Sequence, residues 1–257
     1  MNVSRCAAAY LPVGRVSGGM RDVPALSLTW CEGLFAHWPV DSSQVRPLVP
    51  DALEVDTREE TAWVSALSSL VEAARPRFLP ERAGLTFPQV NLRTYVRYDG
   101  EPGVYFLSLD ATTELGVRLA RAVWDLPYHR AEIDFQRAGE RRRFDSQRLH
   151  TDDSPARFAA EYRPTGEPTH ADPDSLSSFL AERYRLYLVR NGDRENAADQ
   201  SVWCARVEHD PWRLAPAEAS VHADSLLDSV GLPAPAADPV VWYAPVAEFT
   251  VRTPFRV

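Results

Sequence analysis

Polar and apolar positions alternate along much of the chain, which is the pattern of half-buried β-strands. It is clearest over residues 90–111. Odd positions from 91 to 97 are Asn, Arg, Tyr and Arg, whereas even positions are mainly apolar. A turn over residues 99–103, which begins Asp-Gly, then leads into a second and more continuously apolar run. We therefore predict a β-hairpin over residues 90–111. A second hairpin is predicted over 131–149, with its turn at Gly139.

Helical patterns are short by comparison. After the first hairpin, Thr113 is placed to cap a helix in which Leu115, Leu119 and Val123 recur at four-residue spacing. Asp110 precedes this helix, and we expect its carboxylate to stabilise the helix N-terminus. Further short helices are expected within 41–50, 172–191 and 221–233, and strands within 26–40, 52–57, 61–73, 156–166, 201–214 and 240–257.

Two local features complete this prediction. Residues 75–88 hold three prolines and a glycine, which favours an irregular loop, and Pro39 is expected to turn the chain after the strand at 26–40. Short strands with a few short helices predict an α+β domain around a mostly antiparallel sheet that can close on itself. We expect one domain over residues 20–257. Residues 1–19 read as a disordered leader, and the sequence leaves open whether translation starts at Met1 or Met20.

Composition limits the classes of partner. The formal charge is −8, which argues against a nucleic-acid partner because phosphate binding needs a basic face. No apolar run approaches the ~20 residues of a membrane helix, so we expect no membrane partner. The three cysteines have no Cys-x-x-Cys spacing. That count predicts a reducing, cytoplasmic location and no structural zinc.

One feature of the composition restricts the chemistry. All 28 basic residues are arginine, and lysine does not occur in the sequence. A guanidinium keeps its proton and is a poor nucleophile, so arginine cannot replace lysine in Schiff-base catalysis. This chain therefore cannot form an imine through a lysine side chain.

Five strings in order resemble the YqjF-like family, also called DUF2071. They are FAHWPV (35–40), NLRTYVRYDGEPGVYFLSLDA (91–111), LPYHRAEI (126–133), FLAERYRLY (179–187) and HDPWRL (209–214). The resemblance runs from about residue 26 to the C-terminus. It implies the acetoacetate-decarboxylase-like fold, a strongly bent and mostly antiparallel sheet that closes into a cone-like barrel around a cavity.

The resemblance also singles out the corner at residues 126–131. In true acetoacetate decarboxylases the Schiff-base lysine lies in a Pro-Lys-Lys string just after a helix. Pro127 matches that proline, and Tyr128 and His129 fall where the two lysines would be. This correspondence makes Tyr128 and His129 the candidate catalytic residues, as a proton donor and a general acid/base. The alternative is that Tyr128 packs in the core and His129 forms a hydrogen bond with a backbone carbonyl. Because neighbouring strand residues point to opposite faces, only one of the two side chains would enter a cavity.

The first hairpin supplies the candidate ligand-binding residues. Asn91, Arg93 and Tyr95 share one face of a strand, where Arg93 can hold a carboxylate through two hydrogen bonds. The alternative is an exposed face on which Arg93 pairs with a nearby acid. The resemblance adds Arg183 and Tyr184, which the pattern alone would place at the surface. Arg183 can also form a buried ion pair with its neighbour Glu182.

Histidines raise the question of a metal. His37 and His209 lie beside tryptophans, and His129 is the third candidate, but the three come from distant segments without metal-ligand spacing. We predict no metal and no cofactor, and interpret His37 as a turn histidine.

Three functions remain open from the sequence. The first is a barrel that binds a small carboxylate- or carbonyl-bearing metabolite. The second is a lysine-independent lyase, decarboxylase-like enzyme or isomerase that uses Tyr128 and His129. The third is an interaction domain with a filled interior. Whether any reaction is catalysed, and whether the chain forms a homo-oligomer, is not determined by the sequence.

Overall fold

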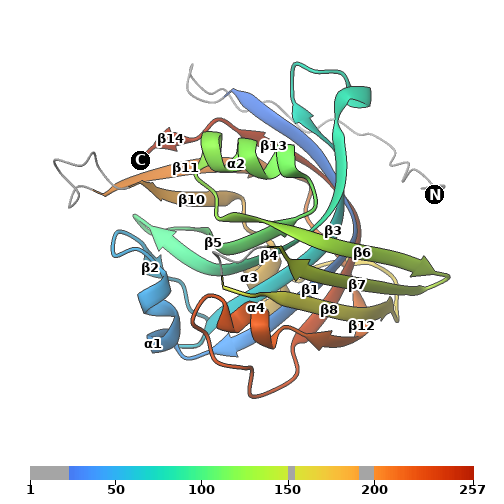
Figure 1. Cartoon of the computed structure of the whole chain (residues 1–257). Helices are drawn as coiled ribbons and strands as arrows, with labels where there is room; N and C mark the ends of the chain where they lie inside the picture. The colour runs from blue at the N-terminus through green and yellow to red at the C-terminus, as the bar shows by residue number, and fades with distance from the viewer. Residues whose placement is uncertain (1–22, 150–153, 191–199) are drawn as a thin grey trace.

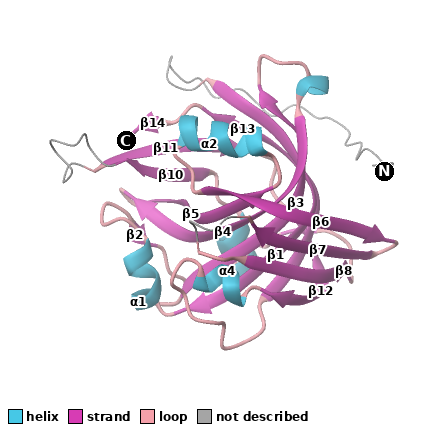
Figure 2. Ribbon diagram, in the orientation of Figure 1, coloured by secondary structure: helices cyan, strands magenta, loops and turns pink. Residues whose placement is uncertain are grey.

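A long, strongly bent β-sheet dominates the computed structural model, which describes residues 23–149, 154–190 and 200–257. Figures 1 and 2 show the sheet wrapping around itself, with a few short helices packed against it. The leader predicted for residues 1–19 lies outside the described residues.

The strands and helices have the following bounds. The strands are β1 (Pro24–Val40), β2 (Glu54–Val55), β3 (Ala62–Pro76), β4 (Leu85–Tyr98), β5 (Glu101–Ala111), β6 (Tyr128–Ala138), β7 (Arg141–Arg148), β8 (Arg157–Pro164), β9 (Thr169–His170), β10 (Arg185–Arg190), β11 (Ser201–Glu208), β12 (Arg213–His222), β13 (Val240–Arg252) and β14 (Phe255–Arg256). The helices are α1 (Ser42–Val45), α2 (Glu114–Trp124), α3 (Leu176–Ala181) and α4 (Asp224–Asp228), with 3-10 turns η1 (Arg46–Leu48) and η2 (Glu81–Ala83).

Strand pairing closes the sheet into two rings that share β13, β1, β3, β4 and β5. In the larger ring, β5 continues through β6, β7, β8 and β12 back to β13. In the smaller ring, β5 continues through β10 and β11 back to β13. Pairing is antiparallel except where β5 meets β6 and β10. The predicted bent, mostly antiparallel sheet with ring closure is therefore confirmed.

Both predicted hairpins are present. Tyr98 pairs with Glu101, so the first turn has the two central residues Asp99 and Gly100, with φ of 50° and 76°. Positive φ at both positions defines the turn that matches strand twist, and it favours the Asp-Gly sequence. In the second hairpin Gly139 takes a φ of 63°.

The predicted irregular loop over residues 75–88 is wrong in part. β3 runs to Pro76 and β4 begins at Leu85, so only the segment between them, with η2, lies outside strands. β3 extends through the proline-rich sequence because it pairs with β1 and β4, and β4 extends there because it pairs with β3. Pro39 likewise does not turn the chain, because β1 continues to Val40 opposite β3.

The predicted helix after the first hairpin forms as α2. The Thr113 hydroxyl accepts a hydrogen bond from the Gly116 amide, which confirms the predicted cap. Asp125 ends the helix in the left-handed conformation. Thr113, and not Asp110, is the N-cap of α2, and the buried carboxylate of Asp110 pairs with Arg148 at 3.0 Å.

The two faces of β4 line the interiors of different rings. Its even-numbered side chains, such as Val90 and Leu92, pack with Phe144 and Phe158 in an apolar core that fills the larger ring. Its odd-numbered side chains face the smaller ring, where Tyr95 packs with Leu180 of α3. The alternation seen in residues 91–98 thus separates an apolar interior from a second, more polar one.

No helix among the described residues is long and apolar enough to span a membrane.

Candidate functional site

Polar side chains from three adjacent strands meet on the face that lines the smaller ring. His37 of β1 pairs in register with Ser65 of β3, and Ser65 pairs with Arg93 of β4. Asn91 and Tyr95 lie two residues to either side of Arg93 and share its face. We call these five residues the polar face. Each is at least nine-tenths buried.

A chain of short hydrogen bonds crosses the polar face. Nδ1 of His37 lies 2.6 Å from Oγ of Ser65, which lies 2.7 Å from the hydroxyl of Tyr95. The Tyr95 hydroxyl donates to the carbonyl oxygen of Leu180 at 2.9 Å. The same carbonyl accepts from Nη2 of Arg93 at 3.0 Å. The end of α3 therefore holds Tyr95 and Arg93 together.

Arg93 differs from the other buried arginines in its electrostatic environment. The described residues include four buried arginines and three buried carboxylates. Arg142 pairs with Glu32 at 2.6 Å, Arg148 with Asp110 at 3.0 Å, and Arg183 with Asp56 at 2.7 Å. Within the described part of the chain, Arg93 has no carboxylate partner.

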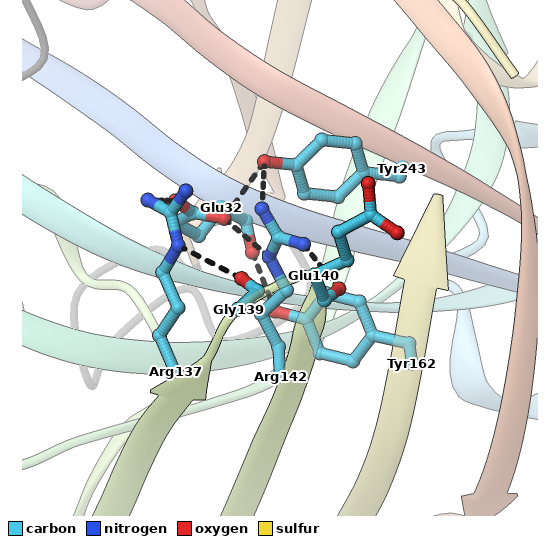
Figure 3. A network of polar contacts seen from close by, with 7 residues as sticks. All are labelled: Glu32, Arg137, Gly139, Glu140, Arg142, Tyr162 and Tyr243. Atoms are coloured by element: carbon cyan, nitrogen blue, oxygen red, sulfur yellow. Dashed lines mark hydrogen bonds and ion pairs between the residues drawn. The ribbon is translucent and has the colours of Figure 1, made fainter. Parts of the chain in front are cut away.

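The Glu32 network shows how completely this protein satisfies a buried charge elsewhere (Figure 3). Arg137 and Arg142 each bond one oxygen of Glu32, at 2.7 and 2.6 Å. Tyr243 also donates to the carboxylate, and Tyr162 donates to the backbone carbonyl of Glu32. A buried charge is tolerated when it is paired and hydrogen-bonded in this way.

Several atoms of the polar face lack any such satisfaction. Nε2 of His37, Nε of Arg93 and both amide atoms of Asn91 are buried without a hydrogen-bond partner among the described residues. Nε1 of Trp63, two residues from Ser65 along β3, is also buried without a hydrogen-bond partner among the described residues. An unpaired buried polar group costs about 1–3 kcal/mol, so these are atoms at which a bound molecule would gain hydrogen bonds.

The charge of Arg93 acts on its surroundings. Burial, together with the positive charge of Arg93, holds the pKa of His37 well below its ordinary value of 6.5. Burial also lowers the pKa of His209, and Arg93 contributes in the same direction. His37 is therefore neutral at pH 7, and Arg93 is the charged side chain among the five residues of the polar face.

Tyr128 and His129 point to opposite sides of the sheet. Tyr128 pairs in register with Leu109, which pairs with Asn91, so Tyr128 shares the polar face's side of the sheet. Its hydroxyl donates to Oε1 of Gln89 at 3.1 Å. Burial raises the pKa of Tyr128, so the phenol stays protonated at neutral pH. His129 pairs with Asp110 and shares the opposite face.

The corner that leads into β6 carries an open hollow of about 660 Å³. Phe106, Arg121 and Pro127 are among the residues that line it, but Tyr128 and His129 are not. Arg121 supports the corner by donating to the backbone carbonyl of Tyr128, and it also lies 3.4 Å from Nδ1 of His129.

Arg183 and Tyr184 lie at the border of the polar face. Arg183 is buried over the Tyr95 ring, with its guanidinium 5.2 Å from the ring centre, and is neutralised by Asp56. Arg183 therefore pairs with Asp56 and not with Glu182, the ion pair that the sequence had left possible. Glu182 instead accepts bonds from the Trp212 amide and the Tyr184 hydroxyl. Tyr184 is 37% exposed.

Sequence reasoning missed the role of His37 in this cluster. The residue lies inside a long strand and not in a turn, with its ring fully buried 5.2 Å from that of Trp242. The sequence carried one indirect signal. Trp63, Ser65 and Leu67 share a strand face, so Ser65 is a polar position on an otherwise apolar face, and it is the residue that pairs with His37. Among the described residues no group of three or more potential ligands is arranged to hold a metal.

Comparison with known proteins gives the family and the fold. The model of the uncharacterized conserved protein family DUF2071 matches residues 27–248. The uncharacterized protein YqjF of Bacillus subtilis (strain 168) is 42% identical over 217 residues, which cover 84% of this chain and 86% of that protein.

Solved structures with the same fold are more distant in sequence. The enduracididine biosynthesis enzyme MppR, complexed with pyruvate, has a TM-score of 0.63 at 14% identity, covering 91% of this chain and 90% of its own. The acetoacetate decarboxylase of Legionella pneumophila has a TM-score of 0.62 at 12% identity, covering 96% and 92%. This chain thus belongs to the DUF2071 family and has the acetoacetate decarboxylase-like fold.

Proposed function

We propose that this protein binds a small carboxylate-bearing metabolite on its polar face, with Arg93 as the anchoring cation. The supporting observation is the unmatched guanidinium of Arg93, which is only 7% exposed. Isolated buried charge is costly, whereas a bound carboxylate would complete the pairing that the other three buried arginines already have. Asn91 supplies amide donors beside it.

The fold neighbours are consistent with this class of ligand. The enduracididine biosynthesis enzyme MppR has been solved with pyruvate, a small carboxylate. Its likeness to this chain concerns the fold and does not transfer a ligand. The choice of a carboxylate for this chain therefore depends on Arg93 and Asn91.

The geometry favours binding over the two other functions. Joint acid–base catalysis by Tyr128 and His129 needs both side chains at one place, but successive positions on β6 turn them to opposite faces. An interaction domain with a filled interior agrees with the apolar core of the larger ring. It does not account for the unpaired polar atoms in the smaller one.

Ligand-induced thermal stabilisation tests the proposal. Acetate, lactate, pyruvate and succinate are compared with acetamide and lactamide, which lack the charge. A carboxylate at a hundred times its Kd stabilises by about 2.7 kcal/mol, which is about 5–10 °C in Tm for a chain of this size. We expect carboxylates to raise Tm and the amides to have no effect.

Two variants locate the effect. Arg93→Met keeps the side-chain volume and removes the charge, so it should abolish the stabilisation. Arg141→Met removes the same charge from an exposed position at the start of β7 and should leave it intact. Carboxylate stabilisation that persists in Arg93→Met would refute the site.

A further inference from the structure

The hydrogen-bond chain on the polar face has only one consistent direction. It runs from His37 through Ser65 and Tyr95 to the carbonyl of Leu180. A carbonyl oxygen only accepts, so the single proton of the Tyr95 hydroxyl is donated to Leu180. Ser65 must then donate its proton to Tyr95, because the Tyr95 proton is already used. Consequently Nδ1 of His37 must donate to Ser65.

This direction fixes the tautomer of His37. A neutral imidazole carries one ring proton, and the chain places it on Nδ1. The Tyr95 oxygen, 3.3 Å from Nδ1, is a second acceptor for the same proton. Nε2 therefore has a lone pair and no proton. That atom is buried without a partner in the described structure, so it is an acceptor that needs a donor.

The neutral state of the His37 ring agrees with a single proton on Nδ1. Burial and the charge of Arg93 both lower the pKa of His37, so Nε2 does not gain a proton near pH 7. The ring also contacts the rings of Trp242 and Phe35, with ring centres 5.2 and 6.1 Å away. The polar face thus combines a fixed acceptor at His37 with donors at Arg93 and Asn91.

Building on the proposed carboxylate site, we infer that the ligand is a hydroxy acid. Its carboxylate accepts hydrogen bonds from Nε of Arg93 and the amide of Asn91, and its hydroxyl donates to Nε2 of His37. An oxo acid of the same skeleton presents a carbonyl oxygen to that lone pair, so two acceptors would face each other. Mispairing of this kind makes a polar site reject a close analogue.

An amino acid is also disfavoured, although its ammonium is a donor. Arg93 already gives the site a positive charge, and the buried carboxylate of Asp56 is used by Arg183 and Arg97. Glu182 is engaged by the Trp212 amide and the Tyr184 hydroxyl. A neutral hydroxyl meets the acceptor at His37 without adding a second positive charge.

Nitrogen NMR of the histidine rings tests the tautomer without any ligand. The full-length protein is labelled with 15N-histidine, and the His37 signals are assigned by their loss in His37→Asn. We expect a protonated Nδ1 and an unprotonated Nε2 at pH 7. A proton on Nε2 would overturn the inference and leave the carboxylate site of Arg93 standing.

Calorimetric binding of matched acids tests the ligand class. Lactate is compared with pyruvate and glycolate with glyoxylate, using both lactate enantiomers, and alanine is the amino analogue. We expect the tighter-binding lactate enantiomer to bind about tenfold tighter than pyruvate, and glycolate to bind about tenfold tighter than glyoxylate. Tenfold corresponds to one hydrogen bond of about 1.4 kcal/mol. Alanine should bind more weakly than either.

Tyr95→Phe should weaken this preference. Without the Tyr95 hydroxyl, Ser65 can donate to Nδ1 of His37 or accept from it, so the ring proton is no longer fixed on Nδ1 and oxo acids gain affinity relative to hydroxy acids. Tyr98→Phe removes a hydroxyl from the opposite face of β4 and should keep the hydroxy-acid preference. A structural effect of Tyr95→Phe would weaken both series equally.

The outcomes separate the two proposals. Oxo acids that bind the unmodified protein as tightly as hydroxy acids, with both series lost in Arg93→Met, would refute the hydroxy-acid inference and support the carboxylate site. If neither series binds, the carboxylate site is refuted and the inference is refuted with it.

Discussion

At the residue scale, the pairing of buried charges points to the site. Among the described residues, three buried arginines have a buried carboxylate each, whereas Arg93 has a carbonyl and the Tyr95 ring, whose centre lies 5.7 Å away. The sequence could place Arg93 on a polar strand face, but not show that this position is buried. The sequence also could not show that the buried acids Asp56 and Asp110 pair with Arg183 and Arg148 and not with Arg93.

Removing charge from the two kinds of buried arginine should change stability in opposite directions. Arg93→Met removes an uncompensated charge and leaves the Leu180 carbonyl satisfied by Tyr95. We expect the free energy of unfolding of the ligand-free protein to rise by about 1–2 kcal/mol. Arg148→Met breaks the buried ion pair with Asp110 and should lower it by about 3–5 kcal/mol. Urea denaturation measures both, and a large loss in Arg93→Met would mean that Arg93 is structural.

At the element scale, turn and cap residues predicted their elements correctly where no distant strand pairing opposes them. Asp99-Gly100 fixed the first hairpin because its turn needs two positive φ angles, and Thr113 fixed the start of α2 through its hydroxyl. Prediction failed where pairing with distant strands overrides local preference. β1 continues through Pro39, and β3 and β4 extend into the proline-rich segment, because each has a partner strand there.

The N-cap of α2 gives a prediction for one element. Thr113→Ala removes the acceptor for the Gly116 amide and should lower the free energy of unfolding by about 1 kcal/mol. Thr113→Ser keeps the oxygen and should lose much less. Because α2 leads into the corner before Tyr128 and not onto the polar face, carboxylate binding measured by calorimetry should be unchanged in both. A loss of affinity in Thr113→Ala would show that α2 positions the ligand site.

At the scale of the whole molecule, the site depends on strand order. His37 and Ser65 are 28 residues apart in sequence, as are Ser65 and Arg93, yet the strand register places the three side by side on three strands. The alternating pattern predicted which side chains share a face of one strand. It carried no information on which strands are neighbours, nor on the second closure through β10 and β11 that buries this face.

Closure of the smaller ring can be tested at Gly103, where β5 meets β10. A Cβ at this position would lie 2.6 Å from the Tyr187 ring and 2.9 Å from the backbone oxygen of Arg185, both on β10. Gly103→Ala must therefore push β10 away from β5. We expect a loss of about 1–3 kcal/mol in unfolding free energy. Carboxylate affinity should also fall, although Gly103 is not part of the polar face.

Gly166→Ala is the control for this substitution, because its Cβ would meet only the Pro216 side chain, at 3.4 Å. It should change the free energy of unfolding by no more than about 0.5 kcal/mol and leave binding intact. Denaturation and calorimetry on both variants separate two roles for the β5–β10 contact. If Gly103→Ala loses stability but binds carboxylates normally, the ring closure supports the fold alone. Loss of both shows that the second closure holds Arg93, Ser65 and His37 in their binding arrangement.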